Sequence, residues 1–210
     1  MNLANQLRKS LRHKIGKSRP QRTAGLRVQP CAVALLFLIF SVPLQPQSAP
    51  SVEYRVKAAF LFNFAKFIEW PSDAFPNERT PITLCVFRHD PFGSSLDEVI
   101  RGKTIDNRDL TARRINELPD LKGCHLIFVS GREDKLLSEI DKNVKGGSAL
   151  IVGESADFLE RGGAVQFFLE ENKLRFAVNI DAVQRARLQV SSKLLTLAKI
   201  VHDAGHPRGG

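Results

Sequence analysis

The sequence contains three cysteines, and cysteine side chains can form disulfides, bind metals or act as nucleophiles. Cys31 lies in an apolar run near the N-terminus, whereas Cys85 and Cys124 lie in strand-like runs at 82–87 and 124–129. Neighbouring strands can bring two Cα atoms to bridging distance. In an oxidising compartment we expect one Cys85–Cys124 disulfide, worth about 4 kcal/mol in the chain-entropy model, and in a reducing one two buried thiols.

Motifs for phosphate, metal and nucleophilic chemistry are incomplete. Gly102-Lys103-Thr104 resembles the end of a phosphate-binding loop, but the first glycine of that motif would fall at Asp97. His202 and His206 have the i, i+4 spacing of a metal site, although a glycine and a proline beside His206 place it in a frayed tail. No Gly-x-Ser-x-Gly elbow occurs. We therefore predict no catalytic, cofactor-binding or metal-binding residues, and no enzymatic activity.

Polar residues follow three predicted buried strands. They are Arg88, His89 and Asp90, then Ser130, Gly131 and Arg132, and finally Glu154 and Ser155. In open α/β sheets, ligands bind in the crevice at the carboxyl ends of parallel strands. By this fold logic alone we expect a ligand pocket there, with Arg88, Asp90 and Arg132 as contacts to a ligand or a partner.

Short apolar runs alternate with amphipathic segments, which is typical of βαβ units whose sheet is covered on both faces. A long amphipathic helix is predicted over 52–70, because helices commonly end before a proline such as Pro71. Its phenylalanines are expected to pack on the sheet, with partner binding as the alternative. Strands are expected at 82–87, 110–115, 124–129 and 149–152, and helices at 94–100 and 133–144.

The last third of the sequence predicts a β-hairpin. The runs 164–169 and 174–178 flank a turn at 170–173 that is short enough to require antiparallel strands. Helices are expected over 181–188 and 191–202. The predicted fold class is therefore α/β: a single domain with a mixed, mostly parallel sheet, helices on both faces, and a C-terminal hairpin followed by helices.

Residues 1–52 have the order of features that is typical of a secretory signal. They contain eight basic and no acidic side chains, and an apolar run at 31–40 is followed by prolines and small residues. This run is shorter than the roughly 20 apolar residues of a spanning helix. We therefore expect cleavage and a periplasmic location, with an uncleaved N-terminal membrane anchor as the alternative.

The formal net charge of +9 reflects this leader. Without its eight basic residues, the chain has 23 basic against 22 acidic side chains, so we predict no nucleic-acid partner. About 160 residues then suffice for one domain. We expect a signal peptide over 1–49, an α/β domain over 50–202 and a disordered tail over 203–210.

Several blocks of the sequence resemble the YfiR family. The blocks are 57–61, Trp70-Pro71, 90–93, Gly102-Lys103, Gly123-Cys124 and, above all, the closing stretch 174–198, so the resemblance spans about residues 52–201. Cys85 and Cys124 match one cysteine pair of the family, whereas a second, shorter-range pair has no counterpart here. Arg175 and Asn179 match an arginine and an asparagine of the closing stretch.

The resemblance implies a periplasmic repressor that contacts the external domain of an inner-membrane diguanylate cyclase until envelope or redox stress releases it. For Arg175 and Asn179 it leaves open a pocket or partner contact beside the structural alternatives, a surface strand residue and a helix cap. A homodimer and a small-molecule ligand stay open as further partners. The second hypothesis is a small-molecule-sensing module that acts on a histidine kinase or another membrane receptor.

Overall fold

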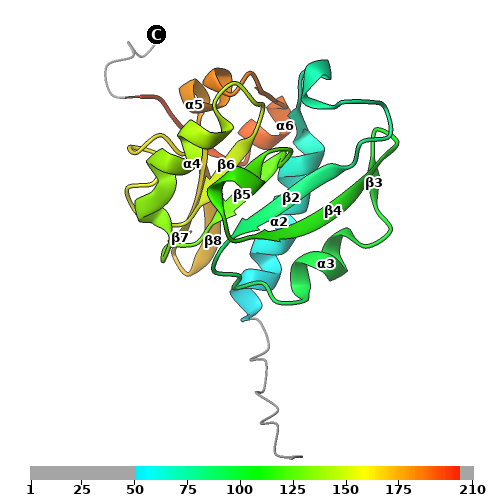
Figure 1. The fold of residues 1–210 in the computed structure, drawn as a ribbon. Helices are drawn as coiled ribbons and strands as arrows, with labels where there is room; N and C mark the ends of the chain where they lie inside the picture. Colours follow the sequence, from blue (N-terminus) through cyan, green and yellow to red (C-terminus); the bar gives the residue numbers. More distant parts are fainter. Residues whose placement is uncertain (1–50, 204–210) are drawn as a thin grey trace, which may run out of the picture. The chain divides into compact units, whose positions relative to one another are not determined.

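Among residues 51–203, which the computed structural model describes, eight strands form one mixed sheet (Figure 1). In spatial order the strands are β10 (Lys199–Val201), β8 (Lys173–Asn179), β7 (Val165–Glu170), β6 (Leu150–Gly153), β5 (Leu126–Val129), β2 (Ile82–Phe87), β4 (Arg108–Ile115) and β3 (Thr104–Ile105). The strands from β7 to β4 are parallel, while β8 and β3 are antiparallel to their neighbours β7 and β4. The predicted α/β class with a mixed, mostly parallel sheet is confirmed.

Helices cover both faces of the sheet. They are α2 (Val52–Phe67), α3 (Ser95–Ile100), α4 (Leu137–Val144), α5 (Ile180–Arg185), α6 (Ser192–Leu195) and the 3-10 helices η3 (Ser72–Ala74), η4 (Leu118–Leu121) and η5 (Asp134–Leu136). In β2, Leu84 and Val86 pack toward the α2 face, whereas Cys85 and Phe87 pack toward the α4 face. Figure 1 shows α2 and α4 on opposite sides of the sheet. All six residues of β2 are buried, as expected for a central strand covered twice.

Helix α2 begins at a serine cap and packs its aromatic side chains on the sheet. The Ser51 hydroxyl accepts a hydrogen bond from the Tyr54 amide, which satisfies one of the free donors of the first turn. The Phe64 ring lies 5.6 Å from the Phe167 ring and 5.0 Å from the Phe176 ring, measured between centroids. This packing agrees with the core interpretation of the phenylalanine stripe. The helix ends at Phe67, before the short strand β1 (Ile68–Glu69), which pairs with β9 (Gln189–Val190).

The predicted hairpin is present, and its turn has the backbone that such a short loop requires. Glu170 and Lys173 form the last strand pair, and the two residues between them, Glu171 and Asn172, have φ angles of 48° and 62°. Two positive φ angles define the turn type whose twist matches that of the flanking strands. The antiparallel direction of β8 follows directly from this turn.

The predicted helix over 191–202 is wrong. The helical part is α6 alone, and residues 199–201 form strand β10, which pairs in parallel with β8 so that Val201 lies opposite Asn179. Periodicity predicted a helix because it reads only local spacing, whereas the free edge of β8 offers backbone partners to β-branched residues such as Ile200 and Val201. The expected signal peptide over 1–49 lies outside the described residues, as does all of the expected tail over 203–210 except Asp203.

The buried ring of Phe158 lies between two glycines. A Cβ atom built on Gly153 would lie 2.1 Å from this ring, and one built on Gly163 would lie 2.2 Å from it. Phe158 itself is fully buried in the core on the α4 face. The end of β6 and the start of the β7 segment therefore require residues without a side chain.

We predict that Gly153→Ala lowers the free energy of unfolding by about 1–3 kcal/mol, because the added methyl group overlaps the Phe158 ring. Urea unfolding followed by the fluorescence of Trp70, the single tryptophan of the chain, measures this loss. Gly102→Ala is the control: Gly102 has a φ of +67° and nothing within 4 Å, so only backbone strain of about 1–2 kcal/mol per residue applies. If Gly153→Ala unfolded with the stability of the native protein, the Phe158 ring would not be held in place.

Candidate functional site at the carboxyl edge of the sheet

A buried lysine connects α2 to the carboxyl edge of the sheet. The Lys57 side chain is 4% exposed, and its Nζ atom lies 2.5 Å from Glu53 Oε1 and 2.6 Å from Glu154 Oε2. Glu53 is one helical turn before Lys57, while Glu154 directly follows β6 and is 97 residues away in sequence. Because an unpaired buried charge is costly, the two carboxylates are what allow this ammonium group to lie beneath the helix.

Glu154 accepts hydrogen bonds from three donors in two parts of the chain. Besides the Lys57 ammonium, its carboxylate accepts hydrogen bonds from the Tyr54 hydroxyl at 3.1 Å and from the Gly131 amide at 3.1 Å. These groups belong to α2 and to the segment that follows β5. The side chain is only 15% exposed, so Glu154 fixes the first turns of α2 against the ends of two neighbouring strands.

The same carboxylates act on the phenol of Tyr54. Burial, the charge of Glu154, the hydrogen bond to Glu154 and the charge of Glu53 together raise the pKa of Tyr54 to about 12, and Arg132 opposes them with the smallest effect. The phenol therefore stays protonated and donates to Glu154 at any physiological pH. The Tyr54 ring also meets the Phe92 ring edge-on, with centroids 5.6 Å apart.

A cavity of about 400 Å³ opens beside this cluster. Its lining combines polar groups with apolar ones: Glu53, Tyr54, Lys57, Glu154 and Gln166, and then Ala156, Phe167, Phe168, Leu169 and Leu174. The size lies within the range of small-molecule sites, which are typically apolar with a few fixed polar groups. The cavity lies between the first turns of α2 and the ends of β6, β7 and β8.

Three buried polar atoms follow the neighbouring strands β2, β5 and β6. His89 Nδ1, Ser130 Oγ and Ser155 Oγ have no hydrogen-bond partner among the described residues. Most buried polar groups in native proteins are hydrogen-bonded, so such a concentration at one edge is unusual. From β2 the chain continues through α3 to β4, and from β5 it continues through α4 to β6 on the other side. Crevices where connections diverge in this way are the usual ligand sites of open α/β sheets.

Arg88, Asp90 and Arg132 follow β2 and β5, as the sequence predicted, but Asp90 is engaged within the protein. Its carboxylate accepts hydrogen bonds from the Phe92 amide at 2.7 Å and from Arg114 Nε at 2.8 Å. Arg88 Nε donates to the Asn116 carbonyl at 3.1 Å, and Arg132 is exposed on its loop. Sequence reasoning missed Arg114, because nothing in the local pattern shows that β4 points it at the loop after β2.

Arg175 and Asn179 lie apart from each other, although both belong to β8. Arg175 is half-exposed near the hairpin, where Nε lies 3.8 Å from Glu170 Oε2. Asn179 is buried and caps α5: its Oδ1 accepts hydrogen bonds from the Asp181 and Ala182 amides at 3.0 and 3.2 Å. Because β8 runs antiparallel to β7, Asn179 lies at the edge of the sheet opposite to Arg88, Asp90 and Arg132.

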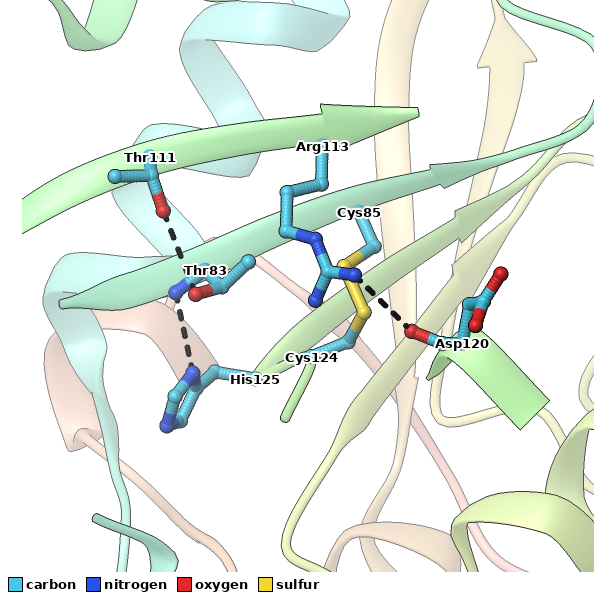
Figure 2. The surroundings of a disulfide bond; sticks show 7 residues. All are labelled: Thr83, Cys85, Thr111, Arg113, Asp120, Cys124 and His125. Carbon is cyan, nitrogen blue, oxygen red and sulfur yellow. Dashed lines mark hydrogen bonds between the residues drawn. A yellow bond between two sulfur atoms is a disulfide. The ribbon is translucent and has the colours of Figure 1, made fainter. Parts of the chain in front are cut away.

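The Cys85–Cys124 disulfide joins β2 to the chain two residues before β5, with the Cα atoms 5.8 Å apart (Figure 2). Cys85 is 1% exposed and Cys124 is 6% exposed, so the bond is shielded from solvent. Arg113 is the strand partner of Cys85 on β4, and its guanidinium donates to the Asp120 carbonyl at 3.5 Å. The closed loop of 39 residues corresponds to about 4 kcal/mol in the chain-entropy model.

His125, the residue after Cys124, is buried as a neutral ring. Its Nδ1 accepts a hydrogen bond from the Thr83 amide at 3.1 Å (Figure 2), and its Nε2 lies 3.3 Å from the Ala74 carbonyl. The ring stacks on Phe75 with centroids 4.5 Å apart. Burial is the main cause that lowers the pKa of His125. A proton on Nδ1 would therefore both break the Thr83 hydrogen bond and place a charge in the core.

Two further properties concern residues 51–203 only. No helix in this range has both the length and the apolar character needed to cross a membrane. Within the same range, no cluster of three or more His, Cys, Asp or Glu side chains is arranged to hold a metal ion.

The architecture is thus an α/β domain whose sheet carries a disulfide on one face and a buried ionic cluster at its carboxyl edge. A family model described as YfiR/HmsC-like matches residues 54–199, and the chain belongs to this family of periplasmic, regulatory proteins. Among solved structures, a conserved domain protein from Vibrio cholerae O1 biovar El Tor is similar, with 10% sequence identity and a TM-score of 0.44. The similarity covers 68% of this chain and 59% of that one.

We predict that Glu154→Gln lowers the pKa of Tyr54 from about 12 toward the ordinary value near 10, because the negative charge beside the phenol is removed while burial remains. Tyr54 is the single tyrosine of the chain, so the ultraviolet absorbance of its phenolate reports on this site alone. A rapid pH jump records the titration before alkaline unfolding. Glu139→Gln, on the exposed face of α4, is the control and leaves the pKa unchanged. An unchanged pKa in Glu154→Gln would contradict the cluster.

We predict that the free energy of unfolding falls as the pH drops below about 6.5, the pKa of an unfolded histidine, toward the lower folded pKa of His125. In this window the unfolded chain binds a proton that the folded protein does not, so the slope reaches at most about 1.4 kcal/mol per pH unit. Urea unfolding at several pH values measures it. The slope is lost in His125→Asn and kept in His202→Asn; a slope that survives in His125→Asn would assign it to another group.

Proposed function

We propose that the protein is a periplasmic, non-enzymatic regulator that binds the external domain of an inner-membrane diguanylate cyclase and represses cyclic di-GMP synthesis. The observation that carries this proposal is the YfiR/HmsC-like match, which extends over residues 54–199. This range includes both cysteines of the disulfide, Lys57 and Glu154 of the ionic cluster, and all strands of the sheet except the end of β10. The basic and apolar leader and a disulfide that joins two strands are both consistent with export to an oxidising compartment.

Two exposed apolar surfaces are available for such a partner. One consists of Val52 and Val56 on α2 with Leu169 on β7, and the other of Leu197 and Ile200 beside the free edge of β10. Exposures of 42–68% are high for large apolar side chains, and burial of each would contribute about 1.5–3 kcal/mol relative to full exposure. The second surface also offers the backbone groups of an edge strand, which partners can extend.

The disulfide gives the regulator a route to redox control. Loss of about 4 kcal/mol on reduction is a large part of the stability of a typical domain, and a tenfold change in partner affinity needs only about 1.4 kcal/mol. The two cysteines are buried, so a reductant reaches the bond only when the surrounding structure opens. The proposed response is therefore coupled to local unfolding around β2 and β5.

The second candidate function is a small-molecule-sensing module that acts on a histidine kinase or another membrane receptor. The specific observation in its favour is the cavity of about 400 Å³ beside the ionic cluster, with unpartnered polar atoms nearby. This candidate and the cyclase repressor differ in the partner they name. Both leave room for a ligand and for a homodimer.

We predict that affinity capture of the exported protein from inner membranes recovers a diguanylate cyclase, and that reductant or Cys85→Ser changes the amount recovered. Leu197→Asp with Ile200→Asp tests the β10 surface, and Val56→Asp with Leu169→Asp tests the α2 surface; one of the two pairs abolishes capture because it places carboxylates in the interface. Cells that lack the protein should contain more cyclic di-GMP. Recovery of only other receptors, or of nothing in either redox state, would rule out the cyclase proposal.

A further inference from the structure

The cavity beside Lys57 has one apolar side and one polar side. Leu169 is 60% exposed and Leu174 is partly buried, and both belong to the hairpin that forms the apolar side. The polar side is formed by Glu53, Lys57 and Glu154. A ligand that fits both sides must therefore carry a polar or charged group and an apolar body.

The charges on the polar side favour a positive group in the ligand. Two carboxylates, Glu53 and Glu154, face one ammonium, that of Lys57. Glu154 already accepts from Lys57, Tyr54 and the Gly131 amide, and it is 15% exposed. Glu53 pairs with Lys57 through Oε1, and 43% of its side chain remains exposed. The free acceptor capacity of the cluster is thus concentrated on Glu53, at the mouth of the cavity.

The pKa of the Tyr54 phenol is consistent with this excess of negative charge. Burial is the largest cause that raises the pKa of Tyr54, both carboxylates also raise it, and Arg132, the smallest of the causes, lowers it. Arg132 is exposed on its loop and does not line the cavity. Because the lining carries two carboxylates and one ammonium, the cavity disfavours an anion and favours a cation.

We propose that this cavity binds an ammonium group attached to an apolar chain or ring, with the ammonium on Glu53 and the apolar part against Leu169 and Leu174. A small free amine and a lysine side chain of a partner protein both supply this chemistry. The inference does not depend on which membrane protein the regulator acts on, because it rests on the cavity and its charges alone.

Three probes of nearly equal shape test the charge preference: 2-phenylethylamine, 2-phenylethanol and 3-phenylpropionate. Isothermal titration of the purified exported protein measures their affinities. We expect 2-phenylethylamine to bind with a Kd on the order of millimolar, as its size allows, and about fivefold more tightly than 2-phenylethanol, with 3-phenylpropionate weakest. Equal affinities for the three probes, or no binding of 2-phenylethylamine, would overturn the proposal.

Variants separate the contribution of the carboxylate from that of the apolar side. Glu53→Gln should weaken 2-phenylethylamine about fivefold and leave 2-phenylethanol unchanged, because only the charge is lost. Leu169→Ser should weaken both probes by the same factor. Glu139→Gln removes an exposed helical carboxylate on α4, on the other face of the sheet, and should change neither affinity. If Glu53→Gln bound 2-phenylethylamine as the native protein does, the ammonium would not lie on Glu53.

Competition identifies the source of the ammonium group. If 2-phenylethylamine displaces the captured membrane partner, and Glu53→Gln weakens capture, a lysine side chain of that partner occupies the cavity. If the amine binds and capture is unchanged, the cavity takes a free amine. Failure to recover a cyclase would leave the amine titration intact, so the two proposals fail independently.

Discussion

The position of the Lys57 ammonium between Glu53 and Glu154 is the interaction on which the candidate site depends. A buried ammonium group needs a negatively charged partner, because removal of one partner from a buried ion pair typically lowers stability by about 3–5 kcal/mol. Glu154 comes from the end of β6, so the pair determines where the first turns of α2 lie relative to the sheet. The cavity beside the cluster and the environment of Tyr54 both follow from that placement. The rest of α2 is held in a different way, by phenylalanine packing on β7 and β8.

The disulfide lies on the other face of the sheet, the face that α4 covers. Cys85 belongs to the core on the α4 face, together with Phe87 and Phe158, while its neighbours Leu84 and Val86 belong to the core on the α2 face. Alternate side chains of strand β2 thus belong to the core on the α2 face and to the core on the α4 face. Reduction would loosen the attachment of β5 to β2, and these two strands end at the loops that carry His89 and Ser130. Strands β2 and β5 therefore run from the region of the disulfide to the carboxyl edge.

A regulator acts through surfaces that bind, and the described part of this chain has exposed apolar side chains and a cavity with polar groups. The polar groups around Glu154 mostly form hydrogen bonds with one another, so their role is structural. By contrast, Glu53 is partly exposed, and the buried polar atoms after β2, β5 and β6 have no partner among the described residues, so these groups can still form hydrogen bonds with a ligand. The exposed large apolar side chains lie on the first turns of α2, on β7 near the hairpin, and on β10 and the residues just before it. Family membership and these surfaces agree on a protein that acts by binding.

The sequence by itself determined the α/β alternation, the hairpin at 170–173 and the candidate pair Cys85 and Cys124, because these depend on local periodicity, on a short turn and on the number of cysteines after the leader. The tertiary structure alone decided that 199–201 joins the sheet as β10, that Asn179 lies at the opposite edge from Arg88, and that Lys57 meets Glu154 across 97 residues. Local sequence patterns do not determine these features. They depend on free backbone groups at the edge of the sheet and on charges that the order of the strands brings together. Such contacts between distant residues leave no periodic trace, and only the folded sheet shows them.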